Sequence, residues 1–286
     1  MTESIDRQDS AAVARLADGL TTLVSAAAGA VFAFDPARVA RRLKADQSPV
    51  TAADAAAEAL IVAGLARQLP GVPVISEEAS GAWPAIGPDA NYVLVDPLDG
   101  TKEFLAGRDE FTVNIALIRQ GRPVFGCIAA PALGLVWRGG TAFGAERLEL
   151  PAGTGIEACR SRTPIRAREF PERGGIALVS RSHFDARSEA LLAGLPVGSV
   201  IGIGSSLKLC RIADGLGDVY PRLAPTHEWD IAAGHAILLA AGGVVLDPQG
   251  ELLTYGNAAA SYLVPGFVAW GDAAAAARFG ARSRKP

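Results

Sequence analysis

The feature that most limits how this chain folds is a short apolar run that ends on an acidic loop. The run Tyr92 to Val95 predicts a buried strand, and the loop 96–101, Asp-Pro-Leu-Asp-Gly-Thr, follows it directly. The proline fixes the backbone and the Asp-Gly pair turns it sharply. Such a loop can aim the Asp96 and Asp99 carboxylates and the Leu98 carbonyl at one point, as Mg²⁺ requires of its oxygen ligands. A bare Asp-x-x-Asp-Gly is nevertheless more typical of an ordinary turn.

A calcium loop of the EF-hand type does not explain these acids. With Asp96 as the first ligand, such a loop needs oxygen side chains at positions 98 and 100 and a glutamate at 107. The chain has Leu98, Gly100 and Gly107 there.

Two further groups of acids stand at the ends of predicted elements. Glu77 and Glu78 follow a predicted strand, Val72 to Ile75, and are either a solvated strand end or a metal ligand beside a supporting acid. Asp230 lies where a helix begins, so its carboxylate caps the helix or binds a metal, and the two roles can coexist.

A glycine turn, Gly202-Ile203-Gly204-Ser205-Ser206, opens another predicted helix. Leu207 occupies the position of the third glycine of a dinucleotide-binding fingerprint, and no Gly-x-x-x-x-Gly-Lys-Ser/Thr occurs. With Ser205 and Lys208 close by, the turn suits an anion at a helix N-terminus. A serine-capped helix explains the same residues equally well.

Composition excludes several functional classes. The net charge of −3 argues against a nucleic-acid scaffold. The three cysteines and three histidines are widely separated and lack the close partners of a zinc site. No apolar run reaches the roughly 18 to 20 uncharged residues of a membrane helix, and Met1 to Ser10 lacks the order of a signal peptide. We therefore expect a cytoplasmic protein with no integral membrane segment.

The pattern of elements predicts an α+β protein. The first thirty or so residues favour a long amphipathic helix, and a second helix begins near Thr51, which forms a capping box with Asp54. Strands dominate from Phe111 to Trp137, and residues 138–174 are weaker in periodicity. The remainder alternates strands and helices. We expect a mainly antiparallel N-terminal domain over residues 1–155 and a smaller α/β domain over 156–286, with a boundary uncertain by about ten residues.

Four motifs in order resemble the inositol monophosphatase superfamily of metal-dependent phosphatases. They are segments 48–54, 76–78, 96–101 and 229–234, the last reading Trp-Asp-Ile-Ala-Ala-Gly. The resemblance extends from about Lys44 to Trp270. It implies the layered αβαβα fold of the sugar phosphatases.

Within the superfamily the chain is most similar to the CysQ-type 3'(2'),5'-bisphosphate nucleotidases. Lys102-Glu103-Phe104 follows the acidic loop, and Val179 to His183, Gly204 to Lys208 and Tyr220 to Arg222 also resemble that subfamily. The departure His227-Glu228, just before Trp229, is expected at the pocket rim without touching a ligand. The resemblance implies hydrolysis of adenosine 3',5'-bisphosphate to AMP and phosphate, and of the related 3'-phosphoadenylyl sulfate, in sulfur metabolism.

The resemblance also assigns roles to residues. Two or three Mg²⁺ ions are expected, one held by Glu77, Asp96 and the Leu98 carbonyl and another by Asp96, Asp99 and Asp230. The catalytic set is Glu77, Thr101 and Asp54, in which the Thr101 hydroxyl, oriented by Asp54, helps to deprotonate a water. The expected substrate-binding residues are Lys44, Leu98, Asp99, Gly100, Thr101, His183, Ser205, Lys208, Arg222 and Asp230.

Other readings of the same residues stay open. An inositol or sugar phosphate phosphatase would use the same metals, and a regulatory homologue would bind metals without turnover. The complete set of acids, with Thr101 and Asp54, argues against the second. The resemblance allows a homodimer and peripheral association with the inner face of the membrane, neither of which composition decides.

Overall fold

A seven-stranded sheet forms the first half of the protein. The computed structural model describes residues 2–43, 49–79, 83–87 and 90–280. The strand order is β3-β4-β5-β6-β7-β8-β9, in which β3 and β4 are parallel and all other neighbours antiparallel. The strands are β3 (Val74–Ser76), β4 (Asn91–Asp99), β5 (Thr112–Arg119), β6 (Arg122–Ala130), β7 (Leu135–Gly140), β8 (Gly144–Glu149) and β9 (Ser161–Pro164).

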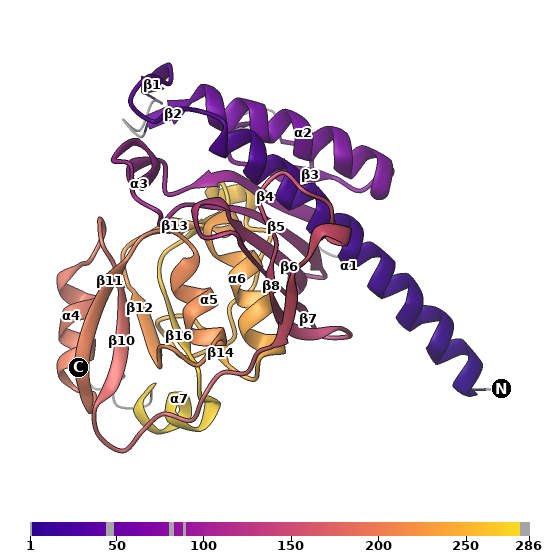
Figure 1. Ribbon diagram of the computed structural model, residues 1–286. Helices are drawn as coiled ribbons and strands as arrows, with labels where there is room; N and C mark the ends of the chain where they lie inside the picture. Colours follow the sequence, from indigo (N-terminus) through magenta and orange to yellow (C-terminus); the bar gives the residue numbers. More distant parts are fainter. Residues whose placement is uncertain (1, 44–48, 80–82, 88–89, 281–286) are drawn as a thin grey trace.

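Two helices cover the outer face of this sheet (Figure 1). They are α1 (Thr2–Phe32), which packs on β5 and β6, and α2 (Ala52–Gln68), which packs on β4. Both helices occur as predicted, and the capping box of α2 is present: the backbone N–H of Thr51 donates to Asp54 Oδ2 at 2.8 Å. Asp54 is thereby buried at the start of α2.

Among the described residues, one stretch of helix, Ala11–Phe32, is long and apolar enough by length and composition to cross a membrane. It contains Arg15 and Asp18, so it is not an uncharged run. It packs on α2 and the seven-stranded sheet, and 44% of its apolar window is buried.

A five-stranded sheet forms the second half, in the order β11-β10-β12-β16-β14. Strand β10 runs parallel to β11 and β12, whereas β16 is antiparallel to β12 and β14. The strands are β10 (Gly175–Ser180), β11 (Val197–Ile203), β12 (Val219–Arg222), β14 (Val244–Leu246) and β16 (Phe267–Trp270).

Helices α5 (Leu207–Ala213) and α6 (Glu228–Ala240) lie between the two sheets (Figure 1). Helix α6 contacts strands β4 to β8, and α5 contacts α6, β10 and β12. Helices α4 (Ala186–Ala193) and α7 (Ala273–Gly280) contact β12 and β16 from the outside. The order of layers is therefore αβαβα, which confirms the predicted fold class.

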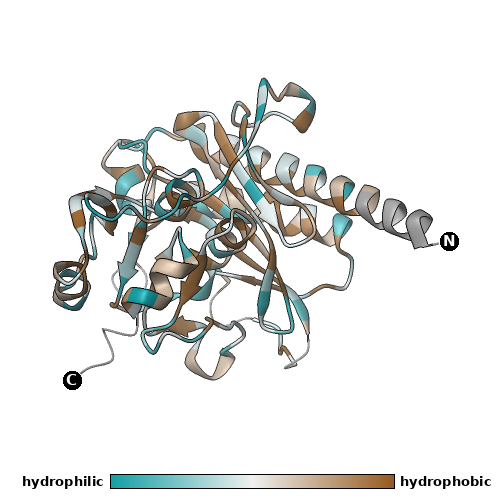
Figure 2. Cartoon of the chain, turned by 90° about the horizontal axis from the view of Figure 1, so that it is seen from below, coloured by the Kyte–Doolittle hydropathy of each residue, from teal (hydrophilic) through white to brown (hydrophobic). Residues whose placement is uncertain are grey.

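Apolar side chains fill the spaces between the layers. One buried cluster joins α1, α2 and the outer face of the seven-stranded sheet, another surrounds α5 and α6, and a third packs α4 and α7 on the five-stranded sheet. In Figure 2 the central strands are mostly brown, and teal residues lie mainly in the surrounding loops. The approach of α6 is closest at Gly126 of β6, where an added Cβ would lie 2.1 Å from the Ala233 carbonyl oxygen.

Short elements were the least predictable. Helix α3 (Thr101–Leu105) and the two-stranded pairs β1 (Arg41–Leu43) with β2 (Pro49–Thr51) and β13 (Thr226–His227) with β15 (Leu263–Val264) were not predicted. The helix expected from Ser205 to Leu216 is shorter, Leu207–Ala213. Strand β9 adds to the first sheet beyond residue 155, and the division into two domains stays a prediction.

Candidate active site

A cavity of about 220 Å³ opens where the end of β4, helix α3, the 202–206 turn and the start of α6 meet. Acids and cations share its wall. The lining residues are Glu77, Asp96, Leu98, Asp99, Gly100, Thr101, Lys102, Glu103, Ser180, Ser182, His183, Gly204, Ser205, Ser206, Lys208, Leu209, Tyr220, Arg222, His227, Asp230 and Ile231.

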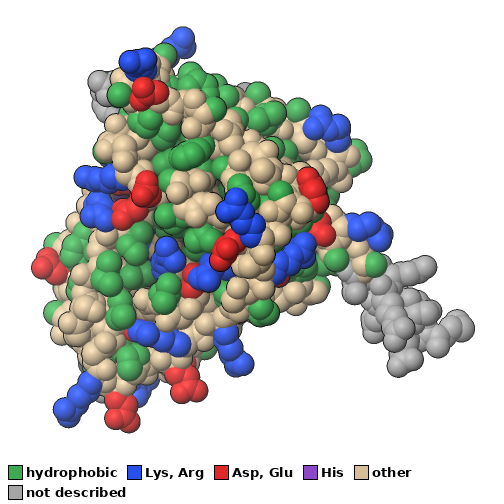
Figure 3. Space-filling view, viewed as in Figure 1, with side chains coloured by type: hydrophobic (Ala, Val, Ile, Leu, Met, Phe, Trp, Pro, Cys, Tyr) green, Lys and Arg blue, Asp and Glu red, His purple; other side chains and the backbone are tan. Residues whose placement is uncertain are grey.

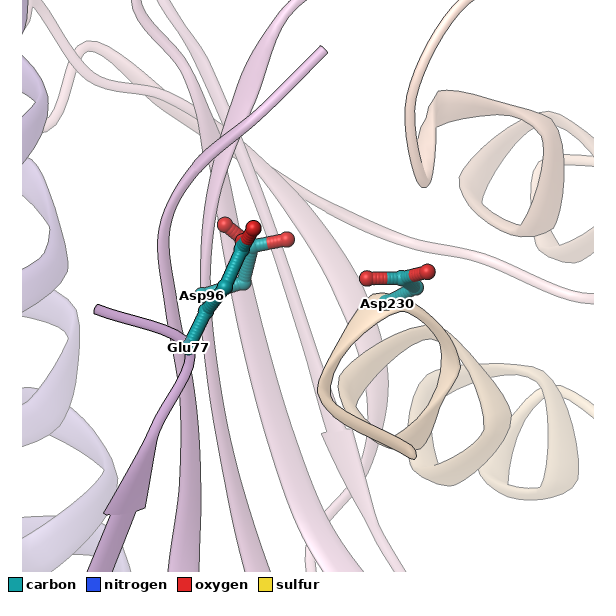
Figure 4. Close-up of side chains that lie close together, drawn as sticks. All are labelled: Glu77, Asp96 and Asp230. Carbon is teal, nitrogen blue, oxygen red and sulfur yellow. The ribbon is translucent and has the colours of Figure 1, made fainter. Parts of the chain in front are cut away.

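Parallel pairing of β3 and β4 places Glu77 beside Asp96. Ser76 is in register with Val95, and the backbone N–H of Glu77 donates to the Val95 carbonyl at 3.1 Å. Helix α6 supplies Asp230 from the opposite wall, as Figure 4 shows. Glu77, Asp96 and Asp230 each offer a carboxylate oxygen within 4.8 Å of the others. Three acids from three segments of the chain therefore converge on one point.

The acidic loop is held by its own backbone. Asp96 Oδ1 accepts from the Leu98 N–H at 3.0 Å, and the Thr101 hydroxyl donates to the Leu98 carbonyl at 3.1 Å. Gly100 has φ of 88°, a left-handed conformation that favours glycine. A Cβ there would also lie 3.0 Å from the Glu110 carbonyl oxygen. The glycine therefore permits both the turn into α3 and its close packing.

Burial and, after it, repulsion between neighbouring acids raise the pKa of Asp96 and Asp99. Burial, followed by the charges of Glu77, Asp99 and Asp230, raises the pKa of Asp96 well above its usual value. Burial and Asp230 raise the pKa of Asp99 to about 6, against the opposing effects of Lys208 and a hydrogen bond from the Ser206 N–H. Clustered carboxylates that resist ionisation are stabilised by a bound cation. Their hard oxygen donors suit Mg²⁺.

We expect Asp99→Asn to stabilise the metal-free protein at pH 8. A carboxyl whose folded pKa is raised binds more protons folded than unfolded, so its contribution to stability falls as pH rises from about 4 to about 6. The shift from 3.8 to about 6 corresponds to on the order of 3 kcal/mol. Thermal melts in EDTA should show the variant above the wild type at pH 8, with the difference shrinking as pH falls and vanishing near pH 3.5. A variant that melts lower at pH 8 would contradict the raised pKa of Asp99.

Asp230 also caps α6. Its carboxylate accepts from the Thr226 hydroxyl and from the His227 N–H, the latter at 3.2 Å. One carboxylate therefore both caps the helix and lines the cavity, as the sequence allowed. His227 lines the cavity as expected, but the expectation that it does not touch a ligand candidate is wrong, because its backbone bonds Asp230.

Two cations, Lys208 and Arg222, also line the cavity. Lys208 is 2% exposed and donates to the carbonyls of Ser205 and Ile203 at 2.5 and 3.1 Å. Burial lowers its pKa to about 8. Arg222 Nε is buried and has no hydrogen-bond partner among the described residues. A buried, unpaired guanidinium donor favours an anionic ligand.

His183 belongs to the same wall. Its Nε2 lies 3.3 Å from Lys102 Nζ, and its backbone N–H donates to the Ser180 hydroxyl at 3.1 Å. Burial, followed by Arg222 and Lys102, lowers the pKa of His183. The neutral ring is therefore favoured near pH 7.

All but two of the predicted site residues line the cavity. Asp54 is buried at the start of α2, where it accepts hydrogen bonds from the backbone N–H and the hydroxyl of Thr51, and Lys44 lies outside the described residues. The Ser206 N–H, expected near an anionic ligand, instead donates to the Asp99 carboxylate at 2.5 Å. The anion nearest this turn is therefore part of the protein.

Sequence reasoning missed several residues of the wall. Glu103 and Tyr220 lie in the motifs quoted above without an assigned role, and Ser206 was expected only as part of the anion-binding turn. Ser206 Oγ donates to Asn114 Oδ1 at 2.9 Å and lies 2.8 Å from the Thr112 hydroxyl of β5. These contacts join the turn after β11 to strand β5 of the other sheet, so no local sequence pattern predicts them.

Comparison with known proteins assigns the chain to a family. A model of the inositol monophosphatase family matches residues 11–280. The chain belongs to this family. Its relatives include the 3'(2'),5'-bisphosphate nucleotidase CysQ of Salmonella typhimurium, 46% identical over 224 residues, or 78% of this chain and 86% of that protein. The CysQ of Escherichia coli K12 is 45% identical over the same shares of both chains.

Solved structures of the family have the same fold. CysQ from Bacteroides thetaiotaomicron superposes with a TM-score of 0.72 at 33% identity, covering 90% of this chain and 97% of that one. An inositol monophosphatase from Anabaena, 21% identical with a TM-score of 0.72, covers 95% of both chains and shows the fold alone. The predicted family, its resemblance to CysQ and the class of enzyme, a phosphatase, are confirmed.

Proposed function

We propose that this protein is a Mg²⁺-dependent 3'(2'),5'-bisphosphate nucleotidase that hydrolyses adenosine 3',5'-bisphosphate to AMP and phosphate. The observation that carries the proposal is a cavity lined both by converging carboxylates and by two cations, the buried Lys208 and the half-buried Arg222. A site for a simple phosphate ester needs the acids and their metal. The two additional cations fit a substrate with a second phosphate. 3'-Phosphoadenylyl sulfate has a similar charge distribution and is a further substrate of the proposal.

The chain's acids would hold the metals. In our proposal Glu77, Asp96 and the Leu98 carbonyl hold one ion, and Asp96, Asp99 and Asp230 hold another. When bound, Mg²⁺ supplies charge neutralisation of the phosphoryl group and lowers the pKa of a coordinated water. The support is the chemistry of the donors: oxygen ligands only, gathered in one cavity, with Asp96 and Asp99 held above their usual pKa.

Thr101 relays a proton in this scheme: its oxygen would take a proton from a water while its own hydroxyl proton passes to the Asp54 carboxylate. The hydroxyl donates to the Leu98 carbonyl at 3.1 Å in this structure, so it would have to leave that bond for the relay. Helix α3, which Thr101 begins, contacts β2, the strand that ends at Thr51. Thr51 bonds Asp54, so the predicted pair Asp54 and Thr101 lie on neighbouring elements. Asp54 as the group that orients Thr101 remains our hypothesis.

The cations and His183 would hold the nucleotide. His183 and Ser205 are assigned to the nucleoside, and Lys208 and Arg222 to its second phosphate. Arg222 has a planar fork that pairs with two phosphate oxygens, whereas Lys208 acts as a point charge. The burial of Lys208 and of the Arg222 Nε strengthens such bonds, because competing water is excluded.

Arg222→Lys should raise the KM for adenosine 3',5'-bisphosphate about tenfold or more. The lysine keeps the charge and loses the paired geometry, and a hydrogen bond to a charged group contributes roughly 1.5 to 3 kcal/mol. Steady-state kinetics with saturating Mg²⁺ measure the effect. The matched control is Arg173→Lys, the same change at an exposed arginine, which should leave KM within twofold. Equal KM values for both variants would remove Arg222 from the substrate site.

Phosphate release tests the proposal as a whole. Purified protein with Mg²⁺ is offered adenosine 3',5'-bisphosphate and, separately, inositol 1-phosphate. We expect faster turnover of the nucleotide and none in EDTA. Faster turnover of the inositol ester would make the protein an inositol phosphatase. No turnover of either would favour a non-catalytic, metal-binding homologue.

Other features implied by the resemblance stay predictions. These are a cytoplasmic location, association with a membrane surface, a homodimer, and the assignment of metals to residues 1–155 and substrate to 156–286. Asp230, a proposed metal ligand, belongs to residues 156–286, so the proposed metal site would need ligands from both segments.

A further inference from the structure

Two turns of the five-stranded sheet carry the residues assigned to the nucleotide. One follows β10 and holds Ser182 and His183, and the other follows β11 and holds Gly204 and Ser205. Because β10 and β11 are adjacent and parallel, both turns emerge at the same edge of the sheet. Neither turn belongs to the elements that carry Glu77, Asp96 or Asp99.

Residues that follow the acidic loop bind both turns. Glu103 of α3 accepts from the Ser182 hydroxyl at 2.8 Å. Glu110 accepts from the Gly204 N–H at 2.8 Å and forms a paired contact with Arg181 at 2.7 and 2.9 Å. In Figure 3 acidic and basic side chains lie next to one another on the left of the view, where α3 meets the ends of β10 and β11. One segment thus ties the acidic loop to the turns across the cavity.

Glu103 is the buried member of this set. It is 5% exposed and lines the cavity, whereas Arg181 and Glu110 are 39% and 26% exposed. It also packs against the second turn, because a Cβ added to Gly204 would lie 2.6 Å from its Cγ. Glu103 therefore touches both turns at once.

Electrostatics argue against a role for this carboxylate as a direct ligand of phosphate. A buried carboxylate in the wall of a cavity for a polyanion repels that ligand. Its hydrogen bond to Ser182 is a contact that does not involve the ligand, and hydrogen bonds to charged groups are among the strongest. The geometry is that of a support for the Ser182–His183 turn.

We infer that Glu103 is a positioning residue for the nucleoside part of the substrate. By bonding Ser182 and packing on Gly204, it fixes the two turns that present His183 and Ser205 to the cavity. It does so from the helix that begins at Thr101, so the positions of the reacting phosphate and the nucleoside are set by one segment. This inference rests on the proposed nucleotidase function and adds a determinant of its specificity.

Binding of two product ligands tests the inference. Calorimetry in Mg²⁺ measures the affinity for AMP, which has the nucleoside, and for inorganic phosphate, which lacks it. Glu103→Ala should weaken AMP binding about tenfold, as expected for loss of a hydrogen bond to a charged group, and should change phosphate affinity less than twofold. Asp109→Asn, which removes an exposed charge from the same segment, is the matched control and should change neither affinity.

Two further variants separate positioning from general destabilisation. Ser182→Ala should weaken AMP binding as much as Glu103→Ala, and the double variant should lose no more than either, because both remove one contact. Glu103→Gln keeps an acceptor for Ser182 and should retain AMP affinity within threefold. Unchanged AMP affinity in Glu103→Ala, equal loss for both ligands, or additive losses in the double variant would overturn the inference. If the wild type binds phosphate but not AMP, the proposed nucleotidase function itself fails.

Discussion

Asp99→Asn is expected to lower kcat for adenosine 3',5'-bisphosphate by about a thousandfold or more. The change is isosteric and removes one charge from the acids that would hold the second metal. Metal stabilisation of a phosphoryl-transfer transition state amounts to several kcal/mol, and each 1.4 kcal/mol is a factor of ten in rate. Phosphate release at saturating substrate measures the loss, with the Mg²⁺ concentration varied to separate weakened binding from slowed chemistry.

The stability of this variant distinguishes loss of a ligand from loss of the fold. Because burial and the nearby Asp230 raise the pKa of Asp99, its neutral replacement should not destabilise the metal-free protein. We therefore expect an inactive protein that melts at or above the wild-type temperature in EDTA and gains less from added Mg²⁺. Asp109→Asn, at an exposed acid of the same region, should keep wild-type activity. Near-normal turnover by Asp99→Asn would refute the assigned ligand set.

Gly126→Ala is expected to destabilise the protein by about 3 kcal/mol, at the upper end of the usual cost of overpacking. The added Cβ would lie 2.1 Å from the Ala233 oxygen and 2.8 Å from the Ala233 Cα, both backbone atoms of α6. No side-chain rotation relieves such a contact, so α6 must move away from β6. For a chain of this size the melting temperature should fall by roughly 6 °C or more.

The same shift should disturb the metal site, because Asp230 lies at the N-terminal end of α6 while Asp96 stays on the sheet. We expect weaker Mg²⁺ binding by calorimetry at a temperature where the variant is still folded. The control is Gly87→Ala, since a Cβ there meets nothing within 4 Å; it should leave both stability and Mg²⁺ affinity unchanged. A stable Gly126→Ala with wild-type Mg²⁺ affinity would show that the contact of α6 with β6 is not what places Asp230.

Local patterns predicted the longer elements well, because the residues that determine them are neighbours. The capping box joins Thr51 to Asp54 within one turn, and the apolar spacing of α1 depends on residues three and four apart. The run that ends on Asp96 is likewise a strand of the central sheet. Short elements such as α3 and β9 have too few residues for a period to stand out, so their positions depend on packing partners.

The sequence by itself determined the order of the acids, the turn that follows Asp96 and the family to which the chain belongs. Tertiary structure alone decided that Glu77, Asp96 and Asp230 share one point. Glu77 follows β3, Asp96 lies on β4 and Asp230 lies on α6, so they meet only when the helix packs between the two sheets. The tertiary structure also turned the Ser206 N–H toward Asp99 and brought Glu103 to Ser182. The physical reason is that spacing along the chain controls local hydrogen bonds, whereas contacts between distant segments are set by how the layers bury their apolar faces.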